Sequence, residues 1–397
     1  MSSATPGSRL SSIDALRGAV MIIMALDHTR DFFHAGAATF SPTDLTQTAT
    51  VLFFTRWVTH FCMPAFMFTA GMGAFLFGRN HTKAQLSKLL WTRGLWFILL
   101  ELTVMQLAYN FNLPFRFTLL LLILWIFGIC MIAMAALIHL PVRGLAFLSV
   151  AAIVFHNGLD GIQAAQFGSL AWVWNLLHQP GVVPVAGRPA LVPYTFVPWI
   201  AVMAAGYCCG QVFLLEPAAR RRIMLKTGVF LTIAFVVVRA VNLYGDPVPW
   251  AHQRSGMFTA LSFLNCTKYP ASLDFLLMTL GPLFLVLAYL DQRSFRAGNP
   301  LIVFGRVPMF YFILHFYWLH ALAVLAAWLR YGSAAAKFAF SPLPSMGGPR
   351  ELFPAGFGYS LWVVYGAWAL AVISLYPICQ WFANVKATRR DWWLSYL

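Results

Sequence analysis

Apolar stretches long enough to cross a bilayer recur from one end of this chain to the other. Of the 397 residues, 60% are hydrophobic and only 10% are charged, whereas a soluble domain carries about 25% charged residues. A transmembrane helix needs about 20 consecutive, mostly apolar residues. Ten ranges meet this need, at about 15–35, 52–78, 85–110, 117–139, 142–158, 193–215, 222–244, 270–290, 300–330 and 358–384. The sequence therefore predicts an all-α fold, a polytopic membrane helix bundle of about ten transmembrane helices.

The basic residues give this bundle a predicted orientation. The formal net charge is +15, and the Lys and Arg clusters fall at alternate ends of the predicted spans. These clusters are Arg79/Lys83/Lys88/Arg93, Arg143, Arg220/Arg221/Arg222/Lys226, Arg293/Arg296 and Lys386/Arg389/Arg390. Such an excess is typical of cytoplasmic loops, so we expect both termini in the cytoplasm. The whole chain, 1–397, is then a single membrane domain with short tails at 1–12 and 386–397. Topology accounts for the positive charge, and no nucleic-acid partner is predicted.

The loops on the opposite side are longer, and the cysteines show no metal-binding pattern. Longer outer loops are expected at about 36–50, 159–192, 245–269 and 331–357, where a substrate-facing surface would be built. The six cysteines lie mostly in or beside the spans, without the spacing of metal ligands. We therefore expect no disulfide framework and no metal site.

Five ionisable side chains lie within eight residues of the first predicted span: Asp27, His28, Arg30, Asp31 and His34. A charged residue at the centre of a membrane helix costs about 2.5–3.5 kcal/mol on insertion scales, so this cluster is a candidate functional site. Helical spacing makes Asp31 a neighbour of both Asp27 and His34. A carboxylate beside a histidine orients the ring and keeps it basic near neutral pH, which suits general-base or nucleophilic catalysis. The catalytic candidates are therefore His28, His34, Asp27 and Asp31.

Other polar side chains in the spans are candidates for binding a substrate or an acyl donor. Arg17 precedes His28 by eleven residues, about 16 Å along a helix axis and on nearly the same face. Arg56 and His60 are four residues apart on the second span. Near the outer end of its span, Arg239 is expected to snorkel to the interface. The remaining candidates are Glu101, Asp274, Arg306 and His315.

The charged motifs of the first span resemble those of a known family. The segments Ile13-Asp14-Ala15-Leu16-Arg17-Gly18 and Leu26-Asp27-His28-Thr29-Arg30-Asp31-Phe32-Phe33-His34 are similar to bacterial membrane proteins related to the catalytic domain of heparan-α-glucosaminide N-acetyltransferase. The resemblance runs from about residue 9 to 385. Further similar segments are Phe54-Thr55-Arg56-Trp57-Val58-Thr59-His60-Phe61, Lys268-Tyr269-Pro270 with the later Leu280-Gly281-Pro282, and Phe304-Gly305-Arg306-Val307-Pro308 with the later His315. The resemblance adds Lys268 to the binding candidates.

Two histidines match the family's catalytic position in different ways. The wider transmembrane acyltransferase superfamily carries an arginine, ten intervening residues and a histidine, and Arg17 and His28 have this spacing. In the heparan enzyme the histidine regarded as catalytic falls a little later on the same helix, and His34 aligns with it. The resemblance thus leaves His28 and His34 as alternatives for one catalytic role.

The resemblance implies a multi-pass acyltransferase of the bacterial inner membrane. Its donor and co-substrate would be cytoplasmic acetyl-CoA, whose phosphates would face Arg17 and the basic loops, and its acceptor a sugar amine or hydroxyl on the far side. A histidine base in a ternary complex and an acyl-histidine relay both remain open, and so does a homodimer. Two other functions compete with acyl transfer: a proton-coupled transporter that uses the same His/Asp chain, and a structural membrane subunit.

Overall fold

The computed structural model of the chain describes residues 11–37, 39–111, 119–335, 356–389 and 391–396. The helices in chain order are α1 (Ser11–Phe33), α2 (Thr50–Trp57), η1 (Val58–Phe61), α3 (Cys62–Gly78), α4 (Lys83–Leu100), η2 (Glu101–Met105), α5 (Gln106–Asn110), α6 (Ile123–Leu137), α7 (Val142–Phe155), η3 (His156–Leu159), η4 (Ala164–Leu170), α8 (Ala171–Leu177), α9 (Phe196–Cys209), η5 (Gly210–Leu214), α10 (Pro217–Val241), α11 (Gly256–Leu264), α12 (Leu273–Leu290), α13 (Pro300–Arg306), α14 (Pro308–Tyr331), η6 (Gly332–Ala335), α16 (Leu361–Thr388) and η8 (Trp392–Tyr396). The strands are β1 (Leu119–Leu120), β2 (Gly181–Val185) and β3 (Arg188–Val192). The predicted tail 1–12 and the predicted loop 331–357 lie mostly outside the described residues.

The predicted all-α, polytopic bundle is confirmed. Seven helical segments within the described residues are long and apolar enough to cross a membrane: Thr50–Gly78, Val142–Leu159, Phe196–Leu214, Pro217–Val241, Leu273–Leu290, Pro308–Ala335 and Leu361–Thr388. The other three predicted ranges hold α1, which carries the charged cluster, α4 with η2 and α5, and the shorter α6. The number of spans and the cytoplasmic position of the termini stay predictions.

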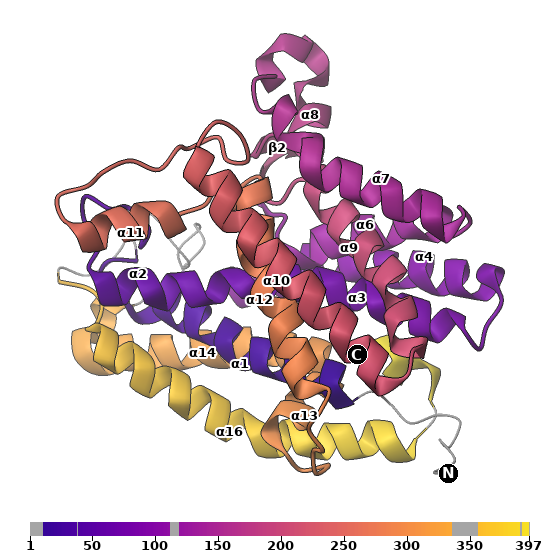
Figure 1. The fold of residues 1–397 in the computed structure, drawn as a ribbon. Coiled ribbons are helices and arrows are strands. Elements are labelled where there is room, and N and C mark those ends of the chain that lie inside the picture. The colour runs from indigo at the N-terminus through magenta and orange to yellow at the C-terminus, as the bar shows by residue number, and fades with distance from the viewer. Residues whose placement is uncertain (1–10, 38, 112–118, 336–355, 390, 397) are drawn as a thin grey trace.

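The helices run back and forth between two ends of the bundle (Figure 1). At one end, the Ser12 hydroxyl donates to Asp291 after α12 (3.1 Å), which also accepts from Arg220 near the start of α10 (2.8 Å). At the other end, the backbone N–H of Tyr359, just before α16, donates to the carbonyl of Phe33 in α1 (2.8 Å). The start of α1 and the end of α16 therefore lie at the same end of the bundle, as an even number of crossings requires.

Helix α1 is enclosed by its neighbours along most of its length. It packs against α3, α13, α14 and α16. Glycines permit the closest of these approaches, because a Cβ on Gly18 would overlap the carbonyl of Leu301, and one on Gly305 would overlap the carbonyl of Asp14. Since other helices surround α1, its charged residues face protein rather than lipid, as charges in membrane helices usually do.

Prolines shape two of the spans. The predicted single span 300–330 is split into α13 and α14 at Val307, whose φ of −127° and ψ of 46° are not helical. Pro308 explains the break, because a proline ring disfavours a helical conformation of the residue before it. In the second span a 3₁₀ turn, η1, joins α2 to α3 and ends three residues before Pro64.

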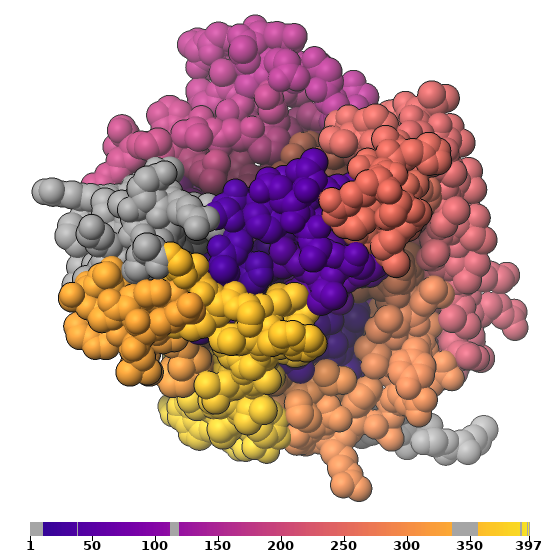
Figure 2. All heavy atoms as spheres, turned by 90° about the vertical axis from the view of Figure 1, so that its left-hand side faces the viewer, coloured from indigo at the N-terminus to yellow at the C-terminus, as the bar shows by residue number. Residues whose placement is uncertain are grey.

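A small sheet and short helices lie at the end of the bundle opposite the start of α1. The predicted orientation makes this the outer end. β3 pairs antiparallel with β2 and parallel with β1. Residues 119–120 pair as the strand β1, so α6 begins only at Ile123, whereas the predicted range starts at 117. Residues 112–118 lie outside the described part. Figure 1 shows α8 standing out from the bundle at the top. Figure 2 looks at this end, where the segment after α1 (indigo) occupies the centre, between α8 above and the α11 region to the right.

Candidate active site

A cavity of about 260 Å³ lies beside the charged cluster of α1. The side chains around it come from α1, the second span, α5, α14 and the outer segments that include β1, β3 and the loop before α12. The lining residues are Met24, Asp27, His28, Arg30, Asp31, Arg56, Thr59, Cys62, Met63, Phe66, Tyr109, Leu120, Leu122, Ile123, Leu191, Pro193, Tyr194, Lys268, Tyr269, Phe312 and Phe316. A mainly apolar pocket with a few convergent polar groups is the usual form of a small-molecule site.

Asp27 joins α1 to the second span through two arginines. Its Oδ1 accepts from Arg30 Nη2 at 3.0 Å, and its Oδ2 accepts from Arg56 Nη1. Arg30 also donates to Asp31 Oδ1 at 2.5 Å. Helical spacing places Asp27, Arg30 and Asp31 on one face of α1, so the cluster is locally built and then completed by Arg56. Because Asp27 is engaged by two guanidinium groups, its charge is compensated within the protein.

His28 projects into the cavity without a hydrogen bond. Within the described part of the chain, neither its Nδ1 nor its Nε2 has a hydrogen-bond partner, although the residue is only 9% exposed. Its ring lies against Phe316 at 4.1 Å between centroids and 5.3 Å from the ring of His315. The carboxylate of Asp31 lies 3.9 Å from His28 Nδ1. Buried polar atoms are rarely left unpaired, so this ring has the capacity to bond a ligand or a water molecule in the cavity.

His34 lies elsewhere, although it follows on the same helix. It sits just past the end of α1, about 9 Å along the helix from His28, and is not among the lining residues. Its Nδ1 accepts from the backbone N–H of Gly36 at 3.1 Å, and its backbone bridges to Tyr359. Of the two histidines that the sequence leaves as alternatives, the structure brings His28 to the cavity.

Two tyrosines and a lysine form the outer wall of the cavity. The hydroxyls of Tyr194 and Tyr269 are 3.2 Å apart, and Lys268 Nζ lies 5.4 Å from the centroid of the Tyr269 ring. Burial by itself raises the pKa of the Tyr269 phenol, but the cations of Lys268 and Arg56 bring this pKa below its usual value. No carboxylate of the described residues forms an ion pair with Lys268. The wall therefore favours a negatively charged or strongly polar ligand group.

The binding candidates nearer the basic end do not reach this cavity. Arg17 donates to the Thr69 hydroxyl (3.2 Å) and to the Thr69 carbonyl (2.5 Å). Arg306 Nε lies 4.0 Å from Asp14 Oδ2 and keeps a third of its side chain exposed. Both arginines thus lie toward the basic end of the bundle, where a phosphate-bearing donor would arrive if that end faces the cytoplasm.

His60 and His315 lie in the layer of side chains behind the cavity. His60 is buried with its ring 5.4 Å from that of Phe275. His315 is fully buried, and its Nδ1 is 3.0 Å from the carbonyl of Tyr311 one turn earlier. The ring of His315 contacts three residues that line the cavity, His28, Phe312 and Phe316.

Glu101 organises the start of α6 and does not line the cavity. Its carboxylate accepts the backbone N–H groups of Leu124 (2.8 Å) and Trp125 (3.2 Å), and the hydroxyl of Tyr109 (3.1 Å). The first N–H groups of a helix have no partner within the helix, so a buried carboxylate there satisfies them and interacts favourably with the helix dipole. Tyr109, in turn, lines the cavity.

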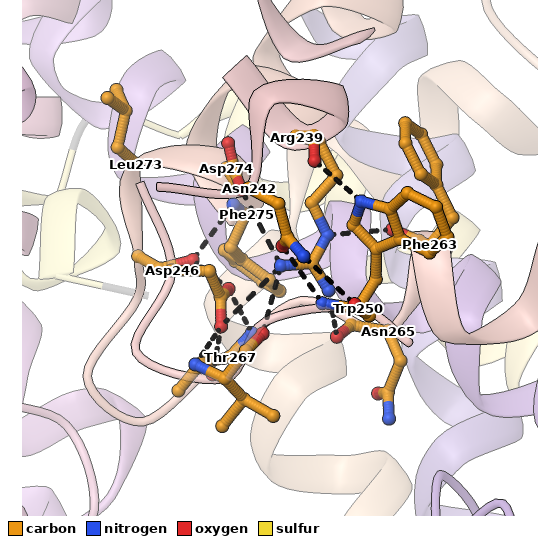
Figure 3. A network of polar contacts seen from close by, with 12 residues as sticks. Arg239, Asn242, Asp246, Trp250, Phe263, Asn265, Thr267, Leu273, Asp274 and Phe275 are labelled. Atoms are coloured by element: carbon orange, nitrogen blue, oxygen red, sulfur yellow. Dashed lines mark hydrogen bonds and ion pairs between the residues drawn. The ribbon is translucent and has the colours of Figure 1, made fainter. Parts of the chain in front are cut away.

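Asp274 belongs to a separate network around Arg239, drawn in Figure 3. Arg239 Nη1 lies 3.6 Å from Asp274 Oδ2 and 3.9 Å from Asp246 Oδ1. The guanidinium also donates to four backbone carbonyls, those of Val248, Ser262, Phe263 and Asn265, at 3.0–3.2 Å. The prediction that Arg239 snorkels is wrong, because its side chain is only 1% exposed and the outer loop folds over it.

Several lining residues were missed by the sequence reasoning. Arg30 belongs to the charged cluster but is not among the residues predicted to form the site. Its three-residue spacing from Asp27 indicates that the two side chains are neighbours on the helix. Tyr109, Tyr194 and Tyr269 carry no such signal, since uncharged aromatic residues are common throughout the spans. Only the fold shows which tyrosines meet the charged cluster.

The described residues contain no group of three or more His, Cys, Asp or Glu side chains placed to hold a metal ion. All six cysteines are free thiols.

Residues 9–244 match the family described as "Heparan-alpha-glucosaminide N-acetyltransferase, catalytic", which is more than half of the chain. The matched range contains α1, the second span and the cavity residues up to Tyr194, whereas Lys268, Tyr269 and α14 follow it. No curated protein matches the chain.

Proposed function

The chain belongs to the heparan-α-glucosaminide N-acetyltransferase catalytic-domain family, which implies a membrane acetyltransferase, and from this premise we propose its reaction. The protein moves an acetyl group from acetyl-CoA, supplied at the basic, cytoplasmic end, to an amine or hydroxyl of a sugar at the opposite end. The bacterial inner membrane is the proposed location. The observation that carries the proposal is the ring of His28, buried in a mainly apolar cavity, with neither nitrogen hydrogen-bonded within the described residues.

His28 is the catalytic residue in this proposal. A neutral imidazole with a free nitrogen accepts a proton from an amine or hydroxyl that approaches within hydrogen-bond reach. Asp31, 3.9 Å from Nδ1, stabilises the imidazolium that forms. Arg56 and Lys268 line the same cavity, where fixed cations stabilise the oxyanion that develops on the acetyl carbonyl.

Two routes fit this arrangement. In a ternary complex, His28 takes the proton of the acceptor as its nitrogen or oxygen attacks the acetyl carbonyl; the C–S bond breaks and the proton leaves with the CoA thiol. In a relay, a ring nitrogen of His28 attacks first, CoA leaves, and the acetyl-imidazole is then attacked by the acceptor. Labelled acetyl-CoA supplied without acceptor distinguishes them, since only the relay leaves acetyl on the protein.

The donor enters from the basic end. Arg17 lies about 16 Å from His28 along α1 and contacts the second span at Thr69. The neighbouring basic loops add charge that attracts CoA phosphates. Arg306, held loosely by Asp14, is a second candidate for the same phosphates.

The decisive experiment compares the two histidines of α1. We expect His28→Ala to lower acetyl transfer from labelled acetyl-CoA to glucosamine, the probe acceptor, by about 10²–10⁴-fold, the usual contribution of a general base. His34→Ala, a matched change about two turns away and outside the cavity, should keep activity within a few-fold. Thermal unfolding of both proteins in detergent controls for folding.

Other outcomes would reassign the site or the function. Loss of transfer in His34→Ala alone would move catalysis to His34. Two results together would favour the transporter. The protein would neither bind nor use acetyl-CoA at millimolar concentration, and it would show proton-driven flux in vesicles.

A further inference from the structure

The two cavity residues Lys268 and Tyr269 sit in the middle of a short loop that is closed on itself. The loop runs from Thr267 to Ser272, and the N–H of Ser272 donates to the carbonyl of Thr267 at 3.0 Å. Lys268 also bridges to Ala271. The loop follows α11 and leads directly into α12, so its position depends on what holds its two ends.

A single buried carboxylate holds both ends. Asp246 accepts the N–H of Thr267 at 2.7 Å, the hydroxyl of Thr267 at 2.7 Å and the hydroxyl of Ser272 at 2.6 Å. Its side chain is 1% exposed. Hydrogen bonds to a carboxylate are stronger than hydrogen bonds between neutral groups. We therefore expect these three short bonds to determine where the loop lies.

Arg239 forms an ion pair with Asp246 and is itself held by the surrounding segment. The guanidinium is 3.9 Å from Asp246 and is tied to four carbonyls of the outer segment, as Figure 3 shows. With its donors satisfied by the protein, the arginine has no capacity left for a ligand. Burying the charge of Arg239 in a membrane protein costs free energy. A role in ordering the chain around it would explain why the charge is there.

We infer that Asp246, fixed by Arg239, is a positioning residue for acyl transfer: it holds the 267–272 loop so that Lys268 and Tyr269 face the cavity. The inference rests on the proposed function and deepens it. Neither Asp246 nor Arg239 lines the cavity, so both act through the loop. Pre-organised groups bind a ligand without a further ordering cost.

The chain offers a matched pair of variants. Ser272 and Ser255 are both N-caps, whose hydroxyls accept from Phe275 in α12 (3.1 Å) and from Phe258 in α11 (3.3 Å). Only Ser272 also donates to Asp246. Ser272→Ala and Ser255→Ala therefore remove the same kind of helix cap, and only the first loosens the loop.

A second pair leaves the caps intact. Thr267→Val removes the hydroxyl that bonds Asp246 while keeping the shape of the side chain, and Thr267→Ser restores a hydroxyl. We expect Ser272→Ala and Thr267→Val to raise hydrogen exchange of amides 267–271 and to raise the KM for glucosamine about fivefold, as expected for one lost hydrogen bond. The kcat should fall by a comparable factor, because Lys268 also stabilises the oxyanion, whereas the KM for acetyl-CoA should stay within twofold. Ser255→Ala and Thr267→Ser should resemble the parent protein.

Each alternative result has a defined meaning. Unchanged exchange in both loop variants would overturn the inference, and so would raised exchange with an unchanged acceptor KM. A purely structural role would lower the melting temperature and the active fraction without moving KM. If the parent protein transfers no acetyl group, the proposed function fails, and the exchange comparison still decides whether Asp246 holds the loop.

Discussion

Arg56, which is partly exposed, and Arg239, which is buried, lie in the half of the bundle away from the start of α1 and are stabilised in different ways. Arg56 pairs with Asp27, a carboxylate of a neighbouring helix, and keeps part of its side chain in the cavity. Arg239 is enclosed by backbone carbonyls of a loop and does not line the cavity beside α1. Guanidinium groups have five donors, so the number left for a ligand depends on the partners that the fold supplies. This difference makes Arg56 a candidate for binding and Arg239 a candidate for positioning.

At the same scale, Glu101 allows a test of structure against function. We expect Glu101→Gln to lower the free energy of unfolding by about 1–3 kcal/mol, because the charge-assisted bonds to Leu124 and Trp125 are weakened and the amide brings an unmatched donor. Thermal unfolding in detergent measures this change. Acetyl transfer by the folded fraction should persist. An unaltered melting temperature with lost transfer would instead place Glu101 in substrate binding, the role predicted from the sequence.

At the scale of elements, the contact between α1 and α13 depends on glycine. The backbone of Leu301 in α13 occupies the space that a Cβ on Gly18 would need. In the same way, the backbone of Asp14 in α1 occupies the space that a Cβ on Gly305 would need. Helix surfaces rich in small residues permit such close approach, and in membranes this packing replaces much of the hydrophobic driving force. The contact sets the position of the basic half of α1, and with it Arg17.

Substituting these glycines should separate the two helices. Gly18→Ala and Gly305→Ala are each expected to destabilise the protein by about 1–3 kcal/mol, since the new Cβ meets backbone that cannot rotate away. Gly144→Ala in α7 is the matched control, because nothing lies within 4 Å of its Cβ, and it should be neutral or stabilising by up to about 1 kcal/mol. Melting temperatures of the three variants in one detergent give the comparison. Equal effects at all three positions would contradict the packing argument.

At the scale of the whole molecule, the alternation of helix directions gathers the basic clusters at one end. The turn between α3 and α4 lies at that end with the start of α1, whereas η3, which leads to η4 and α8, lies at the opposite end, where His156 bonds the carbonyl of Ala271 before α12. The cytoplasmic side of a membrane protein carries the excess of Lys and Arg. The positive charge therefore predicts that this end faces the cytoplasm and that the cavity with His28 lies in the half of the bundle nearer the outside.

Labelling from outside tests this direction. Asn80→Cys and Gln166→Cys are exposed positions at opposite ends, and a membrane-impermeant maleimide applied to intact cells should label only Gln166→Cys. After the membrane is opened, both should react. The parent protein, with its six native cysteines, gives the background. Labelling of Asn80→Cys in intact cells would reverse the orientation and, with it, the proposed path from donor to acceptor.

Much of this protein follows from local sequence. The apolar ranges predict the helical bundle because a lipid environment leaves the backbone few ways to satisfy its hydrogen bonds. The charged cluster of Asp27, His28 and Asp31 stands out because each such residue is costly in a membrane helix and three- and four-residue spacing places them together. Secondary structure and the main polar site are properties of neighbours in the chain.

Tertiary structure decided the rest. It separated His28 from His34, which are equivalent candidates in sequence, because only one of them meets the second span, α14 and the outer loops around a cavity. It also brought Lys268 and Tyr269 to that cavity and enclosed Arg239 in carbonyls instead of leaving it at the interface. These outcomes depend on contacts between residues far apart in the chain, and helical periodicity carries no information about which distant partner a side chain will meet.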